Sequence, residues 1–93
     1  MNEYKYGVVD TSVNSTTVST KPALLKAVYV NTVLSAHTVV IKDDTTAVFT
    51  LPASSSAGDK FDFEDTRFET SLVVDPDDSS TGNITLMYRD LRA

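Results

Sequence analysis

Residues 22–33 decide the fold and read PALLKAVYVNTV. Pro22 cannot donate a hydrogen bond to a strand ladder and tends to start an element, so a long strand is predicted from residue 23 onward. Strict alternation puts apolar residues on both faces of this strand, with Leu24, Val28 and Val30 on one and Leu25, Ala27 and Tyr29 on the other. An antiparallel strand in a two-layer domain normally has one apolar face and one wet face. The second apolar face therefore predicts that Leu25, Ala27 and Tyr29 contact a neighbouring subunit.

Shorter alternating segments follow this strand and predict an all-β fold. They are residues 37–42, 47–51, 60–64, 68–74 and 83–89. The loop at 43–46, rich in Asp and Thr, predicts a hairpin with a type I turn. This spacing is typical of a small antiparallel β-sandwich of 6–8 strands, which we expect over residues 21–93. A jelly-roll and an immunoglobulin-like strand order both remain open.

Residues 1–20 carry a much weaker pattern and are expected to form an N-terminal arm. Tyr4, Tyr6 and Val8 alternate once, which predicts a short strand near residues 4–9. Exposed tyrosines in water are unfavourable, so we expect Tyr4 and Tyr6 to dock on the domain itself or on a neighbour. In a competing interpretation, the arm covers the second apolar face of the long strand within one chain.

Composition agrees with a single small domain rich in strands. The chain has 93 residues, and its 12 Val, 13 Thr and 2 Ile favour a pleated surface over a helix. No apolar stretch approaches the length that spans a bilayer, and the N-terminus lacks the pattern of a secretory signal, so a soluble product is expected. Without cysteine there is no disulfide and no thiolate metal site, and stability must come from buried apolar surface.

The charge pattern predicts neither a nucleic-acid partner nor a membrane partner. Eight Lys and Arg stand against 13 Asp and Glu, for a net charge of -5, and the basic residues are scattered singly. Nucleic-acid binders instead concentrate positive charge to displace counterions from phosphates. An acidic surface is likewise repelled by anionic membranes.

Few side chains could carry catalysis, and we expect no enzyme. His37 is the only histidine, and there is no thiol. Ser35, His37 and Asp43 could be written as a triad, but any surface strand with a histidine would pass that test. No cofactor is expected.

One turn suggests a candidate calcium site. Asp75, Asp77 and Asp78 lie in a segment rich in Pro, Gly and Ser, and Ca²⁺ prefers several oxygen ligands that converge in one loop. Against this, Pro76 stiffens the second position and no distal glutamate follows. The competing interpretation is an exposed hairpin turn whose carboxylates cap local amides.

The order of these segments resembles small virion proteins of tailed bacteriophages. The resemblance covers about residues 21–89 and rests on residues 23–32, 37–51, Phe61, Phe63, 72–74 and 82–89. In that family, a glycine usually stands where this chain has Ser71. The resemblance implies a β-sandwich that acts by binding alone, as a decoration or cement protein on the head shell. Alternatives are a neck, tail or baseplate component, or a free β-sandwich binding module.

That resemblance also implies the partners and the location of the protein. A cement protein bridges neighbouring shell subunits, so the expected partners are the major capsid protein and further copies of this chain, with a homotrimer favoured. Its expected location is the capsid surface of the virion, after synthesis in the host cytoplasm. The predicted contact residues are Tyr4, Tyr6, Leu25, Ala27 and Tyr29.

Overall fold

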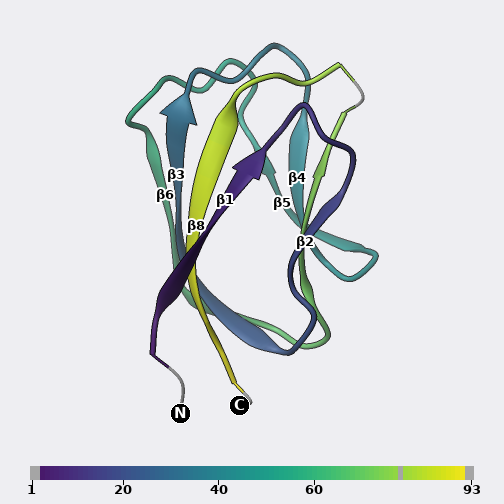
Figure 1. The fold of residues 1–93 in the computed structure, drawn as a ribbon, viewed down its shortest axis with the longest axis vertical. Helices are drawn as coiled ribbons and strands as arrows, with labels where there is room; N and C mark the ends of the chain where they lie inside the picture. The colour runs from purple at the N-terminus through teal and green to yellow at the C-terminus, as the bar shows by residue number, and fades with distance from the viewer. Residues whose placement is uncertain (1–2, 78, 92–93) are drawn as a thin grey trace.

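The computed structural model describes residues 3–77 and 79–91, which form eight β-strands. The strands are β1 (Lys5–Asp10), β2 (Thr16–Ser19), β3 (Ala23–Thr32), β4 (Val39–Asp43), β5 (Thr46–Leu51), β6 (Lys60–Phe68), β7 (Leu72–Pro76) and β8 (Asn83–Asp90). They make two four-stranded antiparallel sheets packed as a sandwich (Figure 1). No helix among the described residues is long and apolar enough to cross a membrane. The predicted small antiparallel β-sandwich is confirmed.

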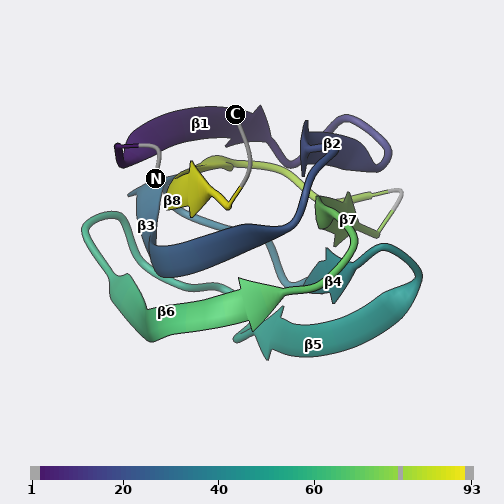
Figure 2. The same ribbon diagram turned by 90° about the horizontal axis from the view of Figure 1, so that it is seen from below.

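The strand order is that of a jelly roll. Sheet A has the order β1-β8-β3-β6, and sheet B has the order β2-β7-β4-β5. β1 pairs with β8, β2 with β7, β3 with β6 and β4 with β5, so the chain resembles one long hairpin with its tip at the β4–β5 turn. Rolling up that hairpin brings β3 against β8 and β4 against β7. Figure 2 shows the resulting two layers, and this topology decides between the two strand orders that the sequence left open.

The core lies between the sheets and consists of side chains that alternate inward. Ile84 and Leu86 of β8 are fully buried, and Ile41, Leu72 and Val74 join the same cluster from sheet B. Phe61 and Phe63 of β6 pack against this cluster while remaining partly exposed, as their alternation with acidic residues predicts. In a chain without cysteine, this apolar burial is the main source of stability.

A β-bulge in β3 overturns the predicted assignment of its apolar residues to the two faces of the strand. Leu25 pairs with Tyr88 and the next pair is Ala27 with Met87, so Lys26 is an extra residue in β3. The bulge shifts the alternation by one residue. As a result, the apolar residues on both sides of it face the core, namely Ala23, Leu25, Val28 and Val30. The prediction was wrong because it assumed strict alternation across the bulge.

Residues 1–20 supply an edge strand to each sheet. The short strand predicted near residues 4–9 is confirmed as β1, which pairs with β8 along its whole length. The following segment, expected to be part of a loosely specified arm, contains β2, which pairs with β7 in sheet B. β1 and β2 extend the two sheets at their edges, and neither strand covers a face of β3.

β4 and β5 form the predicted hairpin, but with a different turn. Only Asp44 and Thr45 lie between the two strands, and Asp44 has a φ of 55°. A type I turn requires negative φ at its central residues, so the predicted turn type was wrong. Aspartate tolerates the left-handed conformation better than most residues because its short side chain can bond locally.

β6 is longer than the strand predicted at residues 60–64 and includes Phe68, which was assigned to the next strand. Glu64 and Asp65 have φ values of 51° and 61°, and the β6 backbone makes a wide bulge there, opposite the bulge at Lys26. With such a bulge, the strand stays paired with its neighbour beyond the point where the alternation of apolar and charged residues stops.

The carboxylate of Asp43 holds the connection between β6 and β7. It accepts hydrogen bonds from the backbone N–H groups of Glu69 at 2.9 Å, Thr70 at 3.0 Å and Ser71 at 3.4 Å. Partial burial raises the pKa of Asp43, but these three hydrogen bonds outweigh it and leave the pKa below its ordinary value. The carboxylate is therefore ionised at neutral pH and ties the β4–β5 end of sheet B to the start of β7.

Candidate functional site

The outer face of sheet A brings together apolar side chains from three neighbouring strands. In one row across the sheet, Tyr6 of β1 lies beside Met87 of β8, which lies beside Ala27 of β3. In the next row, Val8 lies beside Thr85, which lies beside Tyr29. Their sequence neighbours Val9, Leu86 and Val28 are core residues, so these side chains point the opposite way, out of the sandwich.

We define the outer patch as Tyr6, Val8, Ala27, Tyr29 and Met87. Tyr6 is 70% exposed and Val8 is 61% exposed, whereas Tyr29 and Met87 are half-buried. Ala27 has no exposed surface and forms the floor between its larger neighbours. Single exposed apolar residues are ordinary on proteins, but a contiguous group of them across three strands marks a surface that can bind a partner.

Tyr4 is docked on its own domain at one end of the outer patch. The Lys26 ammonium lies 4.9 Å from the centre of its ring, and the Arg89 guanidinium lies 5.1 Å from it. Its hydroxyl donates a hydrogen bond to Asp65 at 2.5 Å, which raises the pKa of Tyr4 above its ordinary value. The Nε atom of Arg89 is buried with no hydrogen-bond partner among the described residues, and the Tyr4 ring provides the favourable contact there.

Four of the five residues predicted as contacts lie on this face, and one does not. Tyr4, Tyr6, Ala27 and Tyr29 come together on the outer face of sheet A. Leu25 is 0% exposed within the core, so its prediction as a contact residue was wrong, and the bulge at Lys26 is the cause. Ala27, although on the correct face, has no surface of its own to offer a partner. Whether the others meet a neighbour stays a prediction.

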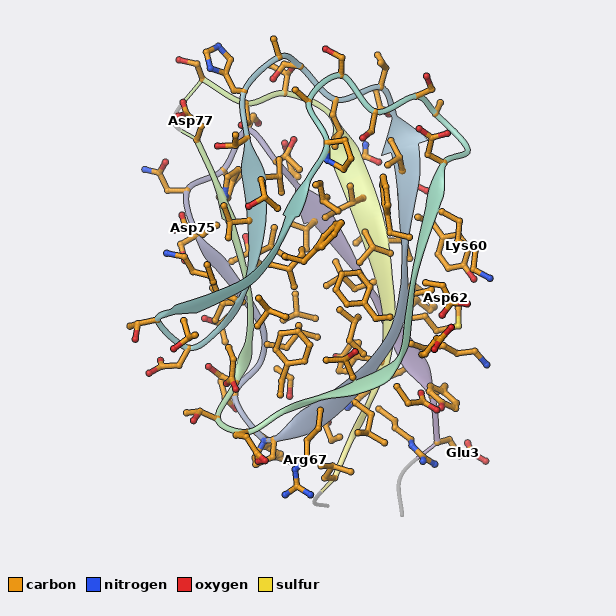
Figure 3. The ribbon with its side chains drawn as sticks, turned by 180° about the vertical axis from the view of Figure 1, so that it is seen from behind. Glu3, Lys60, Asp62, Arg67, Asp75 and Asp77 are labelled. Atoms are coloured by element: carbon orange, nitrogen blue, oxygen red, sulfur yellow. The ribbon has the colours of Figure 1, made fainter. Side chains whose placement is uncertain are left out.

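Side chains of both charges border the outer patch. Lys26 and Arg89 lie against Tyr4, and the Lys60 ammonium is 5.8 Å from the centre of the Tyr29 ring. Figure 3 shows Lys60 and Asp62 pointing outward from β6, at the margin of this face. Asp62 pairs with Ala27 across the sheet, and Asp65 accepts the Tyr4 hydroxyl. The outer face of sheet A thus combines aromatic rings with three cations and two carboxylates at its margin.

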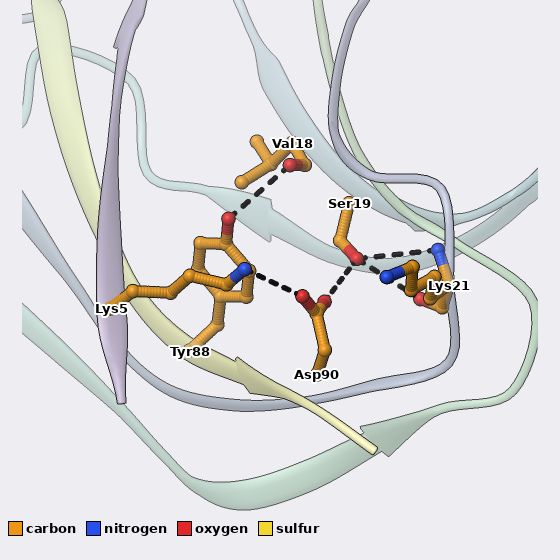
Figure 4. Close-up of polar contacts among 6 residues, drawn as sticks. All are labelled: Lys5, Val18, Ser19, Lys21, Tyr88 and Asp90. Atoms are coloured by element: carbon orange, nitrogen blue, oxygen red, sulfur yellow. Dashed lines mark hydrogen bonds and ion pairs between the residues drawn. The ribbon is translucent and has the colours of Figure 1, made fainter. Parts of the chain in front are cut away.

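A buried carboxylate anchors the strand that carries Tyr6 and Val8. Asp90 at the end of β8 is almost fully buried, and it pairs with Lys5 of β1 at 2.7 Å and accepts the Ser19 hydroxyl of β2 at 2.5 Å (Figure 4). Burial raises the pKa of Asp90, but the hydrogen bonds from Lys5 and Ser19 lower it more, so the pKa stays below its ordinary value. This cluster fixes both N-terminal edge strands to the last strand.

A groove opens at the opposite margin of the sandwich, between the edge strands β5 and β6. It has a volume of about 460 Å³ and is lined by Val48, Phe49, Phe61 and Phe63, with polar residues of β6 at its rim. The Phe49 ring packs edge-on against Phe63 with 5.4 Å between ring centres, and it lies 6.0 Å from Phe61. Phe49 nevertheless remains 39% exposed. The sequence carries no signal for this groove, because its walls come from edge strands of two different sheets.

The residues of the hypothetical triad do not meet. The Ser35 hydroxyl accepts the backbone N–H groups of His37 and Thr81, and the His37 ring lies 3.6 Å from Asp77. Asp43 ends β4, whereas His37 precedes the start of that strand, so the two are at opposite ends of the sandwich. The structure therefore offers this trio no shared chemistry.

The candidate calcium residues are engaged separately. Asp75 pairs with Lys42 at 2.6 Å, and Asp77 accepts the backbone N–H of Ser79 at 3.2 Å. Asp78 lies outside the described residues. Figure 3 shows that Asp75, in β7, and Asp77, just after this strand, lie apart, and no group of three potential metal ligands occurs among residues 3–77 and 79–91.

Comparison with known proteins identifies no relative. No family model matches the chain, and no curated protein or solved structure is significantly similar to it. Of what the resemblance to virion proteins implied, the structure supports the two-sheet sandwich. What the resemblance implied about function and partners depends on the outer patch and stays a prediction.

Met87 and Val8 belong to the outer patch but were not among the predicted contacts. Val8 follows Tyr4 and Tyr6 at the spacing of one strand face, so the alternation in residues 4–8 was a signal for it. Met87 had no such signal, because only the register of β8 between β1 and β3 places it beside Tyr6 and Ala27.

Proposed function

We propose that this chain is a non-enzymatic structural protein of a tailed-phage particle, of the decoration or cement type, and that it binds through the outer patch. The observation that carries the proposal is the patch itself. Tyr6 and Val8 are largely exposed on a paired strand, beside Met87 and Tyr29, although the fold of the single chain does not require apolar residues there. Burial of this surface against a partner would be favourable by about 25 cal/mol for each Å² of apolar area.

The fold and the chemistry of the chain support this type of function. Jelly rolls are a common architecture of viral capsid domains, although the same architecture also serves lectins and cupins. A cement protein stabilises a shell by binding energy alone and needs no catalytic group. An acidic net charge keeps such a protein soluble before it assembles.

The proposed partners are the major capsid protein and further copies of this chain, with a homotrimer favoured, at the capsid surface. The charged margin of the patch, with Lys26, Lys60 and Arg89 beside Asp62, suits a partner surface that carries charges of both signs in complementary positions. The aromatic rings suit the buried centre of an interface, where tyrosine and arginine are enriched. The protein would be made in the host cytoplasm and reach the shell by diffusion.

The location is tested by the composition of phage particles from the source of the sequence. Mass spectrometry of purified particles is expected to find this chain, and immunogold labelling is expected to decorate the head. Label confined to the neck, tail or baseplate would assign the chain to that structure. Absence from the particles would indicate a free binding module and contradict the proposal.

The binding surface is tested by Tyr6→Glu, with Val13→Glu as the matched control. Both positions are exposed, but Val13, at 52% exposure, lies in the loop after β1 and outside the outer patch. Loss of a central tyrosine from an interface commonly costs about 2 kcal/mol or more, which is roughly a 30-fold loss of affinity. We expect Tyr6→Glu to weaken association with the shell or with other copies by at least that factor, and Val13→Glu to leave it unchanged.

A further inference from the structure

The four edge strands of the sandwich differ in how they are protected against pairing with another strand. An edge strand exposes unpaired backbone groups, and natural proteins guard it with charged residues, short length or bulges. β6 carries five charged residues within Lys60–Phe68 and a wide bulge with positive φ at Glu64 and Asp65. β2 has only four residues, and β1 has a charged residue at each end.

β5 has the least protection of the four edges. Its sequence TAVFTL contains no charged residue and no proline, and every residue before Leu51 is exposed. The strand pairs with β4 alone, and no other backbone hydrogen bond in the described part of the chain involves Thr46–Leu51. Its one protective feature is a bulge at Val48, which is 42% exposed. The segment has the high β-propensity and low charge that favour strand-to-strand association.

We infer that the open edge of β5 joins two copies of this chain as an antiparallel strand pair related by a twofold axis. This contact is separate from the outer patch, because β5 is the edge of sheet B and the patch is the outer face of sheet A. The inference goes beyond the proposed function, since it does not depend on any shell protein.

Charge favours a second copy as the occupant of this edge. Two chains of net charge -5 repel each other, so they associate most readily where neither presents a charge. Residues 45–58, which include the whole of β5, contain no Asp, Glu, Lys or Arg. The same neutrality gives β5 no charged group with which to select a foreign strand, whereas a twofold pair places identical Thr, Ala, Val and Phe side chains next to each other.

The groove beside β5 adds apolar surface to this contact. Phe49, Phe61 and Phe63 leave the margin between β5 and β6 open, and a strand added to β5 would lie along that margin. A six-residue pair with this groove belongs to the small class of interface, below about 1,200 Å², that is usually transient. The association should therefore be visible at high protein concentration and be lost on dilution.

The experiment compares the purified chain with Val48→Lys and with Val13→Lys by sedimentation velocity at high and low protein concentration. A lysine on an edge strand blocks strand addition, and Val13 is a similarly exposed valine in the loop between β1 and β2, outside both β5 and the outer patch. At high concentration, the unchanged chain and Val13→Lys are expected to have twice the mass of Val48→Lys. If the unit that pairs is a trimer built through the outer patch, it carries three β5 edges, so its mass should at least double.

Thr50→Lys, also exposed on β5, provides a second edge variant in case Val48→Lys does not fold. An equal mass for the unchanged chain and the folded edge variants at high concentration would overturn the inference, and it would leave β5 free for a foreign strand. Tyr6→Glu should retain the twofold contact, so loss of the outer-patch interaction and loss of the β5 contact are distinguishable. Amide exchange in β5 should also slow with rising concentration in the unchanged chain and in Val13→Lys, but not in the edge variants.

Discussion

Replacement of Leu25 by alanine tests the structural role of the bulge in β3. Leu25 is fully buried and is paired with Tyr88 on one side and Thr66 on the other. Leu→Ala at such a site loses the transfer free energy of the side chain and leaves a cavity, which together cost about 3 kcal/mol. For a domain of this size each kcal/mol lowers the melting temperature by about 5 °C, so we expect a decrease of about 15 °C.

The neighbouring Leu24 provides a control that differs in little except the face of the strand. Leu24 pairs with Arg67 and Arg89 and is half-buried, so Leu24→Ala should cost about 1 kcal/mol. The assay is urea unfolding of both variants, followed by fluorescence or circular dichroism, at several protein concentrations. The loss for Leu25→Ala should be the same at each concentration, because a core residue acts within one chain. Equal losses for the two variants, or a change of assembly mass in Leu25→Ala, would refute the assignment of Leu25 to the core.

Three further predictions concern groups that hold the turns and edges. The pKa of Asp43 is lowered in the folded state, so the unfolded chain binds more protons and stability should fall as pH decreases below about 4. In urea unfolding at pH 7, Asp43→Asn should lower the free energy of unfolding by about 1 to 2 kcal/mol, and it should weaken the dependence of stability on pH. In a thermal unfolding scan, Gly82→Ala should destabilise the fold by more than about 1 kcal/mol, because Gly82 has a φ of 107° and an added Cβ would lie 2.7 Å from a backbone oxygen. The control Gly58→Ala, at a φ of 92° with open space around the residue, should cost clearly less. Asp90→Asn should weaken the anchoring of β1 and lower stability by about 2 kcal/mol. Relative to the unchanged chain, amide exchange should then accelerate more in β1 than in β3, and an equal acceleration in both strands would contradict the anchoring role.

The sequence predicts where the strands of this fold lie better than it predicts which face of the sheet each residue occupies. Residues 37–51 and 83–89 alternate cleanly, and the hairpin and the closing strand were found where the alternation places them. The strand at residues 23–33 was also found, but the bulge at Lys26 is set by the register of its two neighbours. One residue out of register reverses the facing of every residue beyond it, which is why Leu25 was assigned to the wrong side.

Long-range pairing explains the remaining differences. β2 is only four residues long and is stabilised by β7, more than 50 residues away in sequence, so its own pattern is too short to predict it. Met87 joins the outer patch through the same kind of distant pairing. The exposure of β5 likewise follows from its place at the end of sheet B, because its residues are apolar enough to suggest a buried strand.

The outer patch and the edge of β5 together describe a protein with two separate surfaces for association. The patch uses side chains on a sheet face, surrounded by Lys26, Lys60 and Arg89. The edge uses backbone groups in a neutral segment. Substitution on one surface should leave the other intact, since Tyr6 and Val48 belong to different sheets.

The central claim, that the outer patch is a binding surface, is tested most directly by hydroxyl-radical footprinting of the protein in its assembled and dilute states. Tyr6 is 70% exposed in the single chain and should become protected on assembly. His37, which is exposed at the far end of the loop before β4, should react equally in both states. Equal reactivity of Tyr6 in the assembled and dilute protein would contradict the claim.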